Sequence, residues 1–278
     1  MRTGPASFGD LLAALVAERG PICAGVDPRA DLLPPGLDAA GWAEELGRRL
    51  GARVAALKPQ LAFFQDEWAG PERCAHAAAL AGGALVIADC KRGDIDSTAA
   101  AYAERILGPK SPFQAATVNP WLGRDSLRPF VDAAAAHGKG LFVLVHTSNP
   151  GAADVQGLEL AGGERVYERV ARLVDELGAP HVGAAGLSCV GAVVGLTVAP
   201  EVVARLRALM PRAPFLMPGY GAQGGGLAAL RAALAGQGSA LVSASRSLTL
   251  PWKGEAPADW RERVLAALEA MRAELARA

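Results

Sequence analysis

The sequence predicts an α/β protein, a single-domain (β/α)8 barrel of the TIM type, on three observations. Short apolar segments alternate with longer helical stretches along the 278 residues. The first apolar segment ends in Val26-Asp27-Pro28-Arg29, whereas an open doubly wound sheet usually carries a Gly-rich turn there. No linker or composition break divides the chain, so residues 1–278 are expected to form one barrel domain with an N-terminal helix and a C-terminal closing helix.

The expected elements alternate from one end of the chain to the other. Strands are predicted at the apolar segments 22–26, 54–57, 84–87, 115–118, 141–145, 191–195, 214–217 and 240–244. Helices are predicted at residues 8–19, 42–50, 74–80, 95–107, 126–137, 164–177, 201–210 and 260–276. The fifth strand is the clearest. The sixth is the least distinct, because residues 181–189 are also apolar and Gly-rich.

Composition excludes several classes of partner. The 28 basic and 28 acidic residues give a net charge of zero, and no block of Lys and Arg occurs, so neither nucleic acid nor a membrane surface is an expected partner. No apolar run approaches the ~20 residues that span a bilayer, and the N-terminus does not resemble a signal peptide. The four cysteines lack metal-ligand spacing. A reducing cytoplasm is therefore the expected location.

Polar residues follow most of the predicted strands. In (β/α)8 barrels the active site forms at the carboxyl ends of the strands. A ring of polar groups at that end is typical of a small-molecule site. Asn119 is interpreted as a structural cap at the barrel rim. The other residues of the predicted ring are Asp27, Lys58, Asp89, Lys91, Thr147, Ser148, Gln223 and Arg246.

The third strand end carries the most informative residues. Asp89 and Lys91 are two apart, so on an extended strand they point to the same side. Only five of the 28 basic residues are lysines, and both Lys58 and Lys91 stand at strand ends. A carboxylate beside each ammonium keeps it protonated, which suits a reaction in which a carbanion appears and is protonated. The alternative is a structural ion pair that ties a loop to the barrel rim.

The seventh and eighth strand ends predict a phosphate site. Residues 218–226 are Gly-rich, which lets backbone N–H groups approach an anion. Arg246 follows the next strand and can hold two phosphate oxygens, with Gln223 as a neutral donor. The alternative is a flexible surface turn. Whether Tyr220 also contacts phosphate stays open.

At these residues the chain resembles orotidine 5'-phosphate decarboxylases, in particular the longer bacterial (type 2) subgroup. The family motif D-x-K-x-x-D-I-x-x-T matches residues 89–98, which have the sequence D-C-K-R-G-D-I-D-S-T. Residues 117–123 and 146–151 resemble the longer subgroup. Further residues fall in the family's order along nearly the whole chain: Asp27, Lys58, Pro218, Gly219, Gln223 and Arg246.

The resemblance implies a cofactor-independent, metal-free decarboxylation of orotidine 5'-monophosphate to uridine 5'-monophosphate and CO2, in de novo pyrimidine biosynthesis. It implies that Lys91 donates a proton to C6 of the pyrimidine. Asp89 would lie against the substrate carboxylate and disfavour it in the ground state, and Lys58 would hold the network and contact the ribose. Asp94 and Thr98 would serve the neighbouring subunit's site, so a homodimer with shared active sites is expected.

The resemblance also implies the groups that bind the nucleotide substrate. Asp27 would bind ribose hydroxyls, and Gln223 and Arg246 would bind the phosphate. Ser148, with or without Thr147, would contact the pyrimidine ring.

Three alternative functions fit these residues less well. A sugar-phosphate decarboxylase or aldolase of the same superfamily needs a metal-binding Glu near the second strand end, where this chain has Lys58-Pro59-Gln60. A Schiff-base aldolase needs a neutral Lys91, which Asp89 opposes. A non-catalytic nucleotide sensor needs only the phosphate grip and would not require Lys58, Asp89 and Lys91 together.

Overall fold

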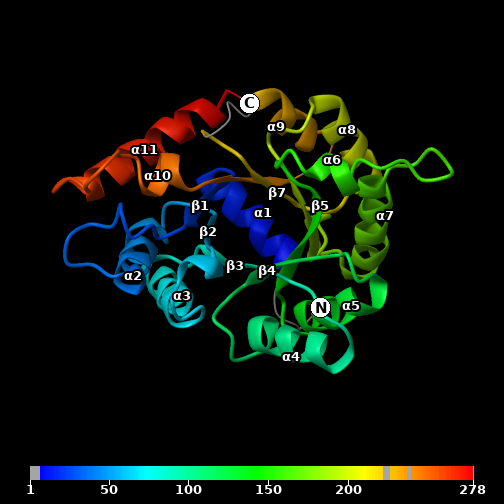
Figure 1. Cartoon of the computed structure of the whole chain (residues 1–278), viewed down its shortest axis with the longest axis horizontal. Helices are drawn as coiled ribbons and strands as arrows, with labels where there is room; N and C mark the ends of the chain where they lie inside the picture. The colour runs from blue at the N-terminus through cyan, green and yellow to red at the C-terminus, as the bar shows by residue number, and fades with distance from the viewer. Residues whose placement is uncertain (1–6, 222–225, 237–238, 278) are drawn as a thin grey trace.

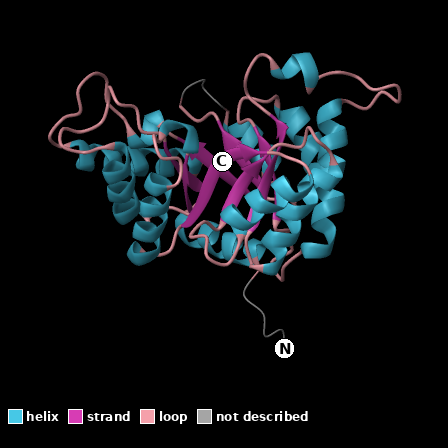
Figure 2. Cartoon of the chain, turned by 60° about the horizontal axis from the view of Figure 1, so that its bottom comes forward, coloured by secondary structure: helices cyan, strands magenta, loops and turns pink. Residues whose placement is uncertain are grey.

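The computed structural model describes residues 7–221, 226–236 and 239–277, and these residues form a closed parallel barrel surrounded by helices. Figure 2 shows the strands enclosed by helices. The strands follow one another around the barrel in chain order, and β1 pairs with β8 to close it. Their bounds are β1 Ile22–Val26, β2 Ala56–Pro59, β3 Leu85–Arg92, β4 Ala115–Val118, β5 Gly140–His146, β6 Val190–Val194, β7 Phe215–Pro218 and β8 Ala240–Ala244. The predicted (β/α)8 fold is confirmed.

Helices surround the barrel, and most of them lie between successive strands in the chain. The long ones are α1 Phe8–Arg19, α2 Ala39–Leu50, α3 Ala69–Ala81, α4 Asp96–Leu107, α5 Arg124–Ala136, α7 Val166–Gly178, α8 Pro200–Leu209 and α11 Trp260–Leu275. The short ones, which the sequence pattern did not predict, are α6 Ala152–Val155, α9 Leu227–Ala233, α10 Arg246–Thr249 and the 3-10 turns at Leu61–Phe63 and Ala179–His181.

Helix α1 closes the amino-terminal end of the barrel, and Figure 1 shows it crossing the barrel in that view. Phe8 is buried and packs edge-on against Phe142 of β5, with ring centroids 6.0 Å apart. Gly140, the first residue of β5, makes room for it, because a Cβ there would lie 2.4 Å from the Phe8 ring. The amino end is thus filled with side chains, which leaves the carboxyl end for a site.

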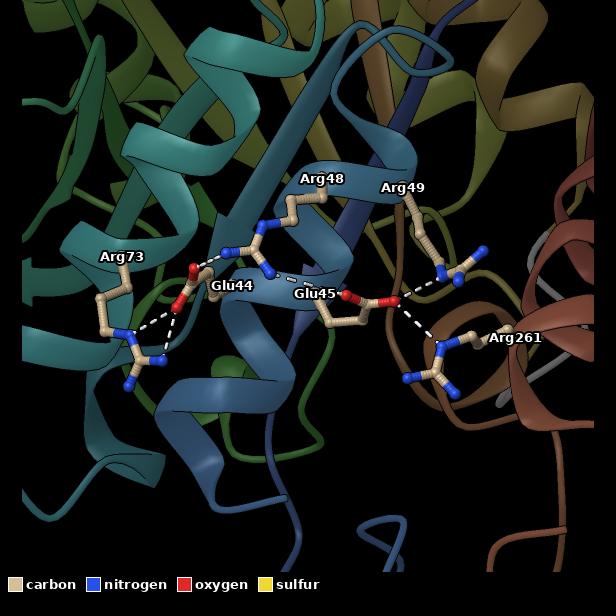
Figure 3. Close-up of polar contacts among 6 residues, drawn as sticks. All are labelled: Glu44, Glu45, Arg48, Arg49, Arg73 and Arg261. Atoms are coloured by element: carbon tan, nitrogen blue, oxygen red, sulfur yellow. Dashed lines mark hydrogen bonds and ion pairs between the residues drawn. The ribbon is translucent and has the colours of Figure 1, made fainter. Parts of the chain in front are cut away.

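Helix α11 is held against the barrel by aromatic and ionic contacts. Trp260 at its start is buried and lies 6.4 Å from Trp252, centroid to centroid. Arg261 donates to Glu45 of α2 in a network of six charged side chains that joins α2, α3 and α11 (Figure 3). The helix that was predicted to close the chain therefore packs beside the elements that follow β8 and β1.

Two strands differ from the prediction in a way that affects the site. β2 begins two residues later than expected, so Lys58 lies inside the strand, paired in register with Gly25 of β1. β3 continues to Arg92, so Asp89 and Lys91 also belong to the strand rather than to the loop after it. The pairing of β3 with β4 shifts between Ala88 and Arg92, which marks a bulge at the residues that carry charge.

Candidate active site

A cavity of about 1310 Å³ opens at the carboxyl ends of β1, β2, β3, β7 and β8. Four residues predicted from the sequence line it: Asp27, Lys58, Asp89 and Arg246. In the described part of the chain, Lys91, Thr147 and Ser148 are not among its lining residues. The cavity therefore brings together the charged groups of the first three strands and the Arg246 side of the barrel, as the ring of strand ends predicted.

Asp89 lies between two lysines, one on each carboxylate oxygen. Lys58 Nζ is 2.5 Å from Oδ2, and Lys91 Nζ is 2.6 Å from Oδ1. The side chains of Lys58 and Asp89 are buried, whereas the Lys91 side chain is 46% exposed. The structure thus forms a Lys58–Asp89–Lys91 triad in which the Lys58 side chain is buried inside the barrel and the Lys91 side chain is partly exposed.

Neighbouring charges favour the ionised forms of Asp89 and Lys58 despite their burial. Burial works against a charged Asp89, but the positive charges of Lys58 and Lys91 outweigh it and hold the pKa of Asp89 well below its usual range. Burial also opposes the charge on Lys58, but the nearby Asp89 and Asp27 carboxylates raise the pKa of Lys58 above its ordinary value. Burial raises the pKa of the neighbouring Cys23 thiol to about 12, which disfavours the thiolate form that a cysteine nucleophile needs.

Asp27 follows β1 and carries an unpaired oxygen. Its Oδ1 is buried and has no hydrogen-bond partner among the described residues. A buried carboxylate oxygen without a donor is costly. Because Asp27 lines the cavity beside Lys58, a hydroxyl or N–H of a ligand can supply the missing donor.

Asp94 and Thr98 stand apart from the triad within one chain. The Asp94 carboxylate accepts the backbone N–H of Ile95 at 2.8 Å, and within the described residues it makes no hydrogen bond or ion pair with Lys58, Asp89 or Lys91. Thr98 lies in the first turns of α4 and is exposed. The motif residues therefore divide into an inward group at Asp89 and Lys91 and an outward group at Asp94 and Thr98.

The two predicted base-contacting residues in the loop after β5, Thr147 and Ser148, differ in their hydrogen bonds. Thr147 is bound within the loop: its Oγ1 donates to Asn149 Oδ1 and accepts from Gln156 Nε2, and its N–H donates to Gln156 Oε1. Ser148 is half-buried, and its hydroxyl makes no hydrogen bond within the described residues. Ser148 is consequently the freer of the two hydroxyls, and Gln156 is a loop-ordering residue that the sequence pattern did not indicate.

The predicted phosphate site is described in part. Gln223 lies outside the described residues. Arg246 begins α10, is exposed, and makes no ion pair with any described residue, so its guanidinium remains available at the cavity.

Tyr220 Oη donates to Glu274 of α11 at 2.6 Å, and burial together with this carboxylate raises the pKa of Tyr220 to about 12. Ser243, Ser245 and Ser247 line the same side of the cavity, and the sequence pattern did not single them out.

Two further polar residues, Asn119 and Thr117, make hydrogen bonds near the carboxyl end of β4. Asn119 Oδ1 accepts the N–H of Trp121 at 3.0 Å, which confirms its interpretation as a structural cap. Thr117 of β4 is buried, and its hydroxyl donates to Asp89 Oδ1 at 2.9 Å. A single Thr is ordinary in a strand, so the sequence pattern assigns Thr117 no role, and only the hydrogen bond to Asp89 shows its place in the site.

Fold and site together define a (β/α)8-barrel enzyme with a lysine–carboxylate site for an anionic small molecule. The chain belongs to the orotidine 5'-phosphate decarboxylase / HUMPS family, whose family model matches residues 20–252.

Relatives in this family are similar over most of the chain. The orotidine 5'-phosphate decarboxylase of Rhodopirellula baltica is 38% identical and covers 97% of this chain and 99% of its own length. That of Salinispora arenicola is 46% identical over 81% of this chain and 83% of its own length. The solved structure of Leishmania donovani OMP decarboxylase superposes with a TM-score of 0.74, at 33% identity, over 96% of this chain and 98% of that one.

Proposed function

We propose that this chain decarboxylates orotidine 5'-monophosphate to uridine 5'-monophosphate and CO2, the last step of de novo pyrimidine synthesis. The observation that carries the proposal is the Lys58–Asp89–Lys91 triad beside the cavity, in a chain of this family. The reaction removes a carboxylate and leaves a carbanion, so it needs preorganised charge at the reacting carbon.

The proposed chemical step uses the triad directly. The bond between C6 and the carboxyl carbon breaks, the electron pair stays on C6, and CO2 leaves. Lys91 Nζ then gives a proton to C6, and solvent reprotonates the amine. Asp89 faces the substrate carboxylate and disfavours the bound ground state, and Lys58 keeps the Asp89 charge in place. The assignment of Lys91 as the proton donor is supported by its contact with Asp89, which lines the cavity, and by a side chain that is only partly buried.

The proposed binding roles follow the unpaired polar groups. Asp27 accepts hydrogen bonds from ribose hydroxyls, which would pair its orphaned Oδ1. Arg246, with Gln223, binds the phosphate. Ser148 contacts the pyrimidine, because the Thr147 hydroxyl is already held by Asn149 and Gln156.

The proposed assembly is a homodimer with shared sites. Asp94 and Thr98 lie away from their own triad, which supports their use in the neighbouring subunit's site. Three large apolar side chains on the loops after β3 and β4 are exposed in the single chain: Ile95, Trp121 and Leu122. A second copy of the chain would cover them.

The remaining proposals concern cofactors and location. No metal or organic cofactor is proposed, because protonation by Lys91 and the fixed charges of the triad supply the chemistry. No helix in the described residues is long and apolar enough to cross a membrane. A cytoplasmic location is proposed, supported by four cysteines that are all unpaired.

The decisive experiment follows orotidine 5'-monophosphate by ultraviolet absorbance, with the purified chain in EDTA. Loss of the substrate band, with uridine 5'-monophosphate as product, is the expected result. Turnover of orotidine 5'-monophosphate that disappears in EDTA and returns with Mg²⁺ would contradict the metal-free step proposed here. Tight binding of uridine 5'-monophosphate without turnover would indicate a nucleotide sensor.

A further inference from the structure

Thr117 of β4 lies opposite the bulge of β3. Ala88 pairs with Ala116 and Arg92 pairs with Val118, so three residues of β3 face the single residue Thr117 of β4. These three are Asp89, Cys90 and Lys91. The Thr117 side chain is 1% exposed, so a hydroxyl is buried where the regular ladder is interrupted.

The Thr117 hydroxyl accepts hydrogen bonds from two backbone amides, the role that a strand carbonyl has in a regular ladder. The N–H groups of Cys90 and Lys91 donate to Thr117 Oγ1 at 3.1 and 2.9 Å. Lys91 has a φ of +48°, in the left-handed region that a residue with a side chain adopts at a cost. Acceptance of its N–H by Thr117 stabilises this conformation.

The same hydroxyl also holds the carboxylate that Lys91 contacts. Thr117 Oγ1 donates to Asp89 Oδ1 at 2.9 Å, the oxygen that lies 2.6 Å from Lys91 Nζ. A hydroxyl has one donor and two acceptor sites, and all three are occupied here. One side chain thus links the backbone of Lys91 to the partner of its ammonium.

We propose that Thr117 is a positioning residue for the decarboxylation: it holds the Lys91 backbone and the Asp89 carboxylate together, and thereby sets where Lys91 Nζ lies. The proposal rests on the proposed function, because it takes proton transfer from Lys91 as the step that needs the alignment. Thr117 does not line the described cavity, so it acts through Asp89 and Lys91 rather than on the substrate.

Replacement of the hydroxyl by a methyl group tests the proposal. Thr117→Val keeps the shape of the side chain, leaves the backbone amides of Cys90 and Lys91 without their acceptor, and leaves Asp89 Oδ1 with Lys91 Nζ alone. Displacement of a reacting group by about 1 Å costs on the order of 100-fold in rate, so we expect kcat to fall about that much. KM and the Kd of uridine 5'-monophosphate should change by less than about 3-fold, because Asp27 and Arg246 are untouched.

The experiment compares kcat and KM for orotidine 5'-monophosphate, the Kd of uridine 5'-monophosphate and the melting temperature. Thr117→Ser retains the hydroxyl and should keep kcat within about 5-fold of the parent chain. Ser188→Ala is the matched control: Ser188 is a buried hydroxyl that accepts the N–H of Val190 and donates to Gly178 O, remote from the triad. This variant should lower the melting temperature and leave kcat unchanged.

Each result bears on one proposal. A parent chain without turnover contradicts the proposed function, whatever the variants do. With an active parent, full kcat in a folded Thr117→Val chain overturns the role of Thr117. So does a loss confined to KM, or an equal loss in Thr117→Ser. If Thr117→Val does not fold, Thr117→Ala leaves room for water at the two amides and is judged by the same values.

Discussion

At the scale of single residues, the two lysines of the triad differ in their surroundings although both contact Asp89. Lys58 is buried inside the strand ladder, in register with Gly25, and Lys91 stands on a bulge with its side chain half exposed. A buried lysine has little room to move. Lys58 therefore suits holding the carboxylate, and Lys91 suits reaching a substrate.

Replacement of Lys91 tests this division of roles. Lys91→Ala should abolish measurable turnover, because general-acid catalysis is worth about 10²–10⁴-fold and this variant also removes a charge at the reacting carbon. Binding of uridine 5'-monophosphate, measured by calorimetry, should survive. Lys110→Ala, at an exposed lysine outside the cavity, is the control and should retain full activity. A loss of turnover in Lys91→Ala smaller than about 10-fold would contradict the proton-donor assignment.

At the scale of elements, ion pairs connect helices that are distant in sequence. Figure 3 shows Glu44 and Glu45 of α2 between arginines of three helices. Glu44 accepts from Arg73 of α3, and Glu45 accepts from Arg49 at 2.8 Å and from Arg261 of α11 at 3.0 Å. The Glu45 side chain is mostly shielded, unlike that of a surface pair. This network ties the closing helix to the helix that follows β1.

The network predicts a pH-dependent contribution to stability. Burial works against a charged Glu45, but the hydrogen bonds from Arg261 and Arg49 outweigh it and lower the pKa of Glu45 below its ordinary value. A lowered folded-state pKa gives stability that is complete above the ordinary value and is lost as the pH falls through the folded value. Glu45→Gln should therefore lower the free energy of unfolding by about 1 kcal/mol at about pH 7 and by much less at about pH 3.

Urea unfolding at the two pH values measures this difference. Glu269→Gln is the control, because Glu269 is an exposed partner of Arg272 on α11 and should contribute little at either pH. An equal loss for Glu45→Gln at both pH values, or a loss as large in the control, would show that the charge of Glu45 does not hold α11.

At the scale of the whole molecule, the placement of Asp94 sets the test of the shared site. If Asp94 serves the neighbouring subunit, a mixed dimer of Lys91→Ala and Asp94→Ala chains has one site with both residues intact. Mixing two inactive proteins in equal amounts, with subunit exchange, should restore about a quarter of the parent activity, because half of the dimers are mixed and each has one complete site.

Two measurements on the mixture provide the controls for this experiment. Affinity recovery through a tag on one chain must bring down the untagged chain, which shows that the subunits exchange, and sedimentation shows whether the chains are dimers. Recovery of mixed dimers without activity would place Asp94 in its own subunit's site. A chain that stays monomeric throughout would contradict the dimer itself.

Much of the fold could be predicted because the barrel signal is local. The strands Ile22–Val26, Ala115–Val118 and Ala240–Ala244 and the helix Phe8–Arg19 have the predicted bounds, since each is a short apolar or amphipathic run between polar or Gly-containing turns. The spacing of Asp89 and Lys91 likewise predicted an ion pair, and the structure confirms it. The reason differs: the pair forms on a bulge with a left-handed Lys91 and not on a regular strand.

The alternation of strands and helices, the polar strand ends and the family motif can be predicted from the sequence alone, because each lies in a short stretch of chain. The hydrogen bonds from Thr117 to Asp89, from Gln156 to the Thr147 hydroxyl and from Tyr220 to Glu274 depend on the folded structure. These partners lie 28, 9 and 54 residues apart. The first and third contacts arise when the closed barrel brings neighbouring strands and the last helix together, and the second arises from the fold of the loop after β5; no local periodicity encodes any of them.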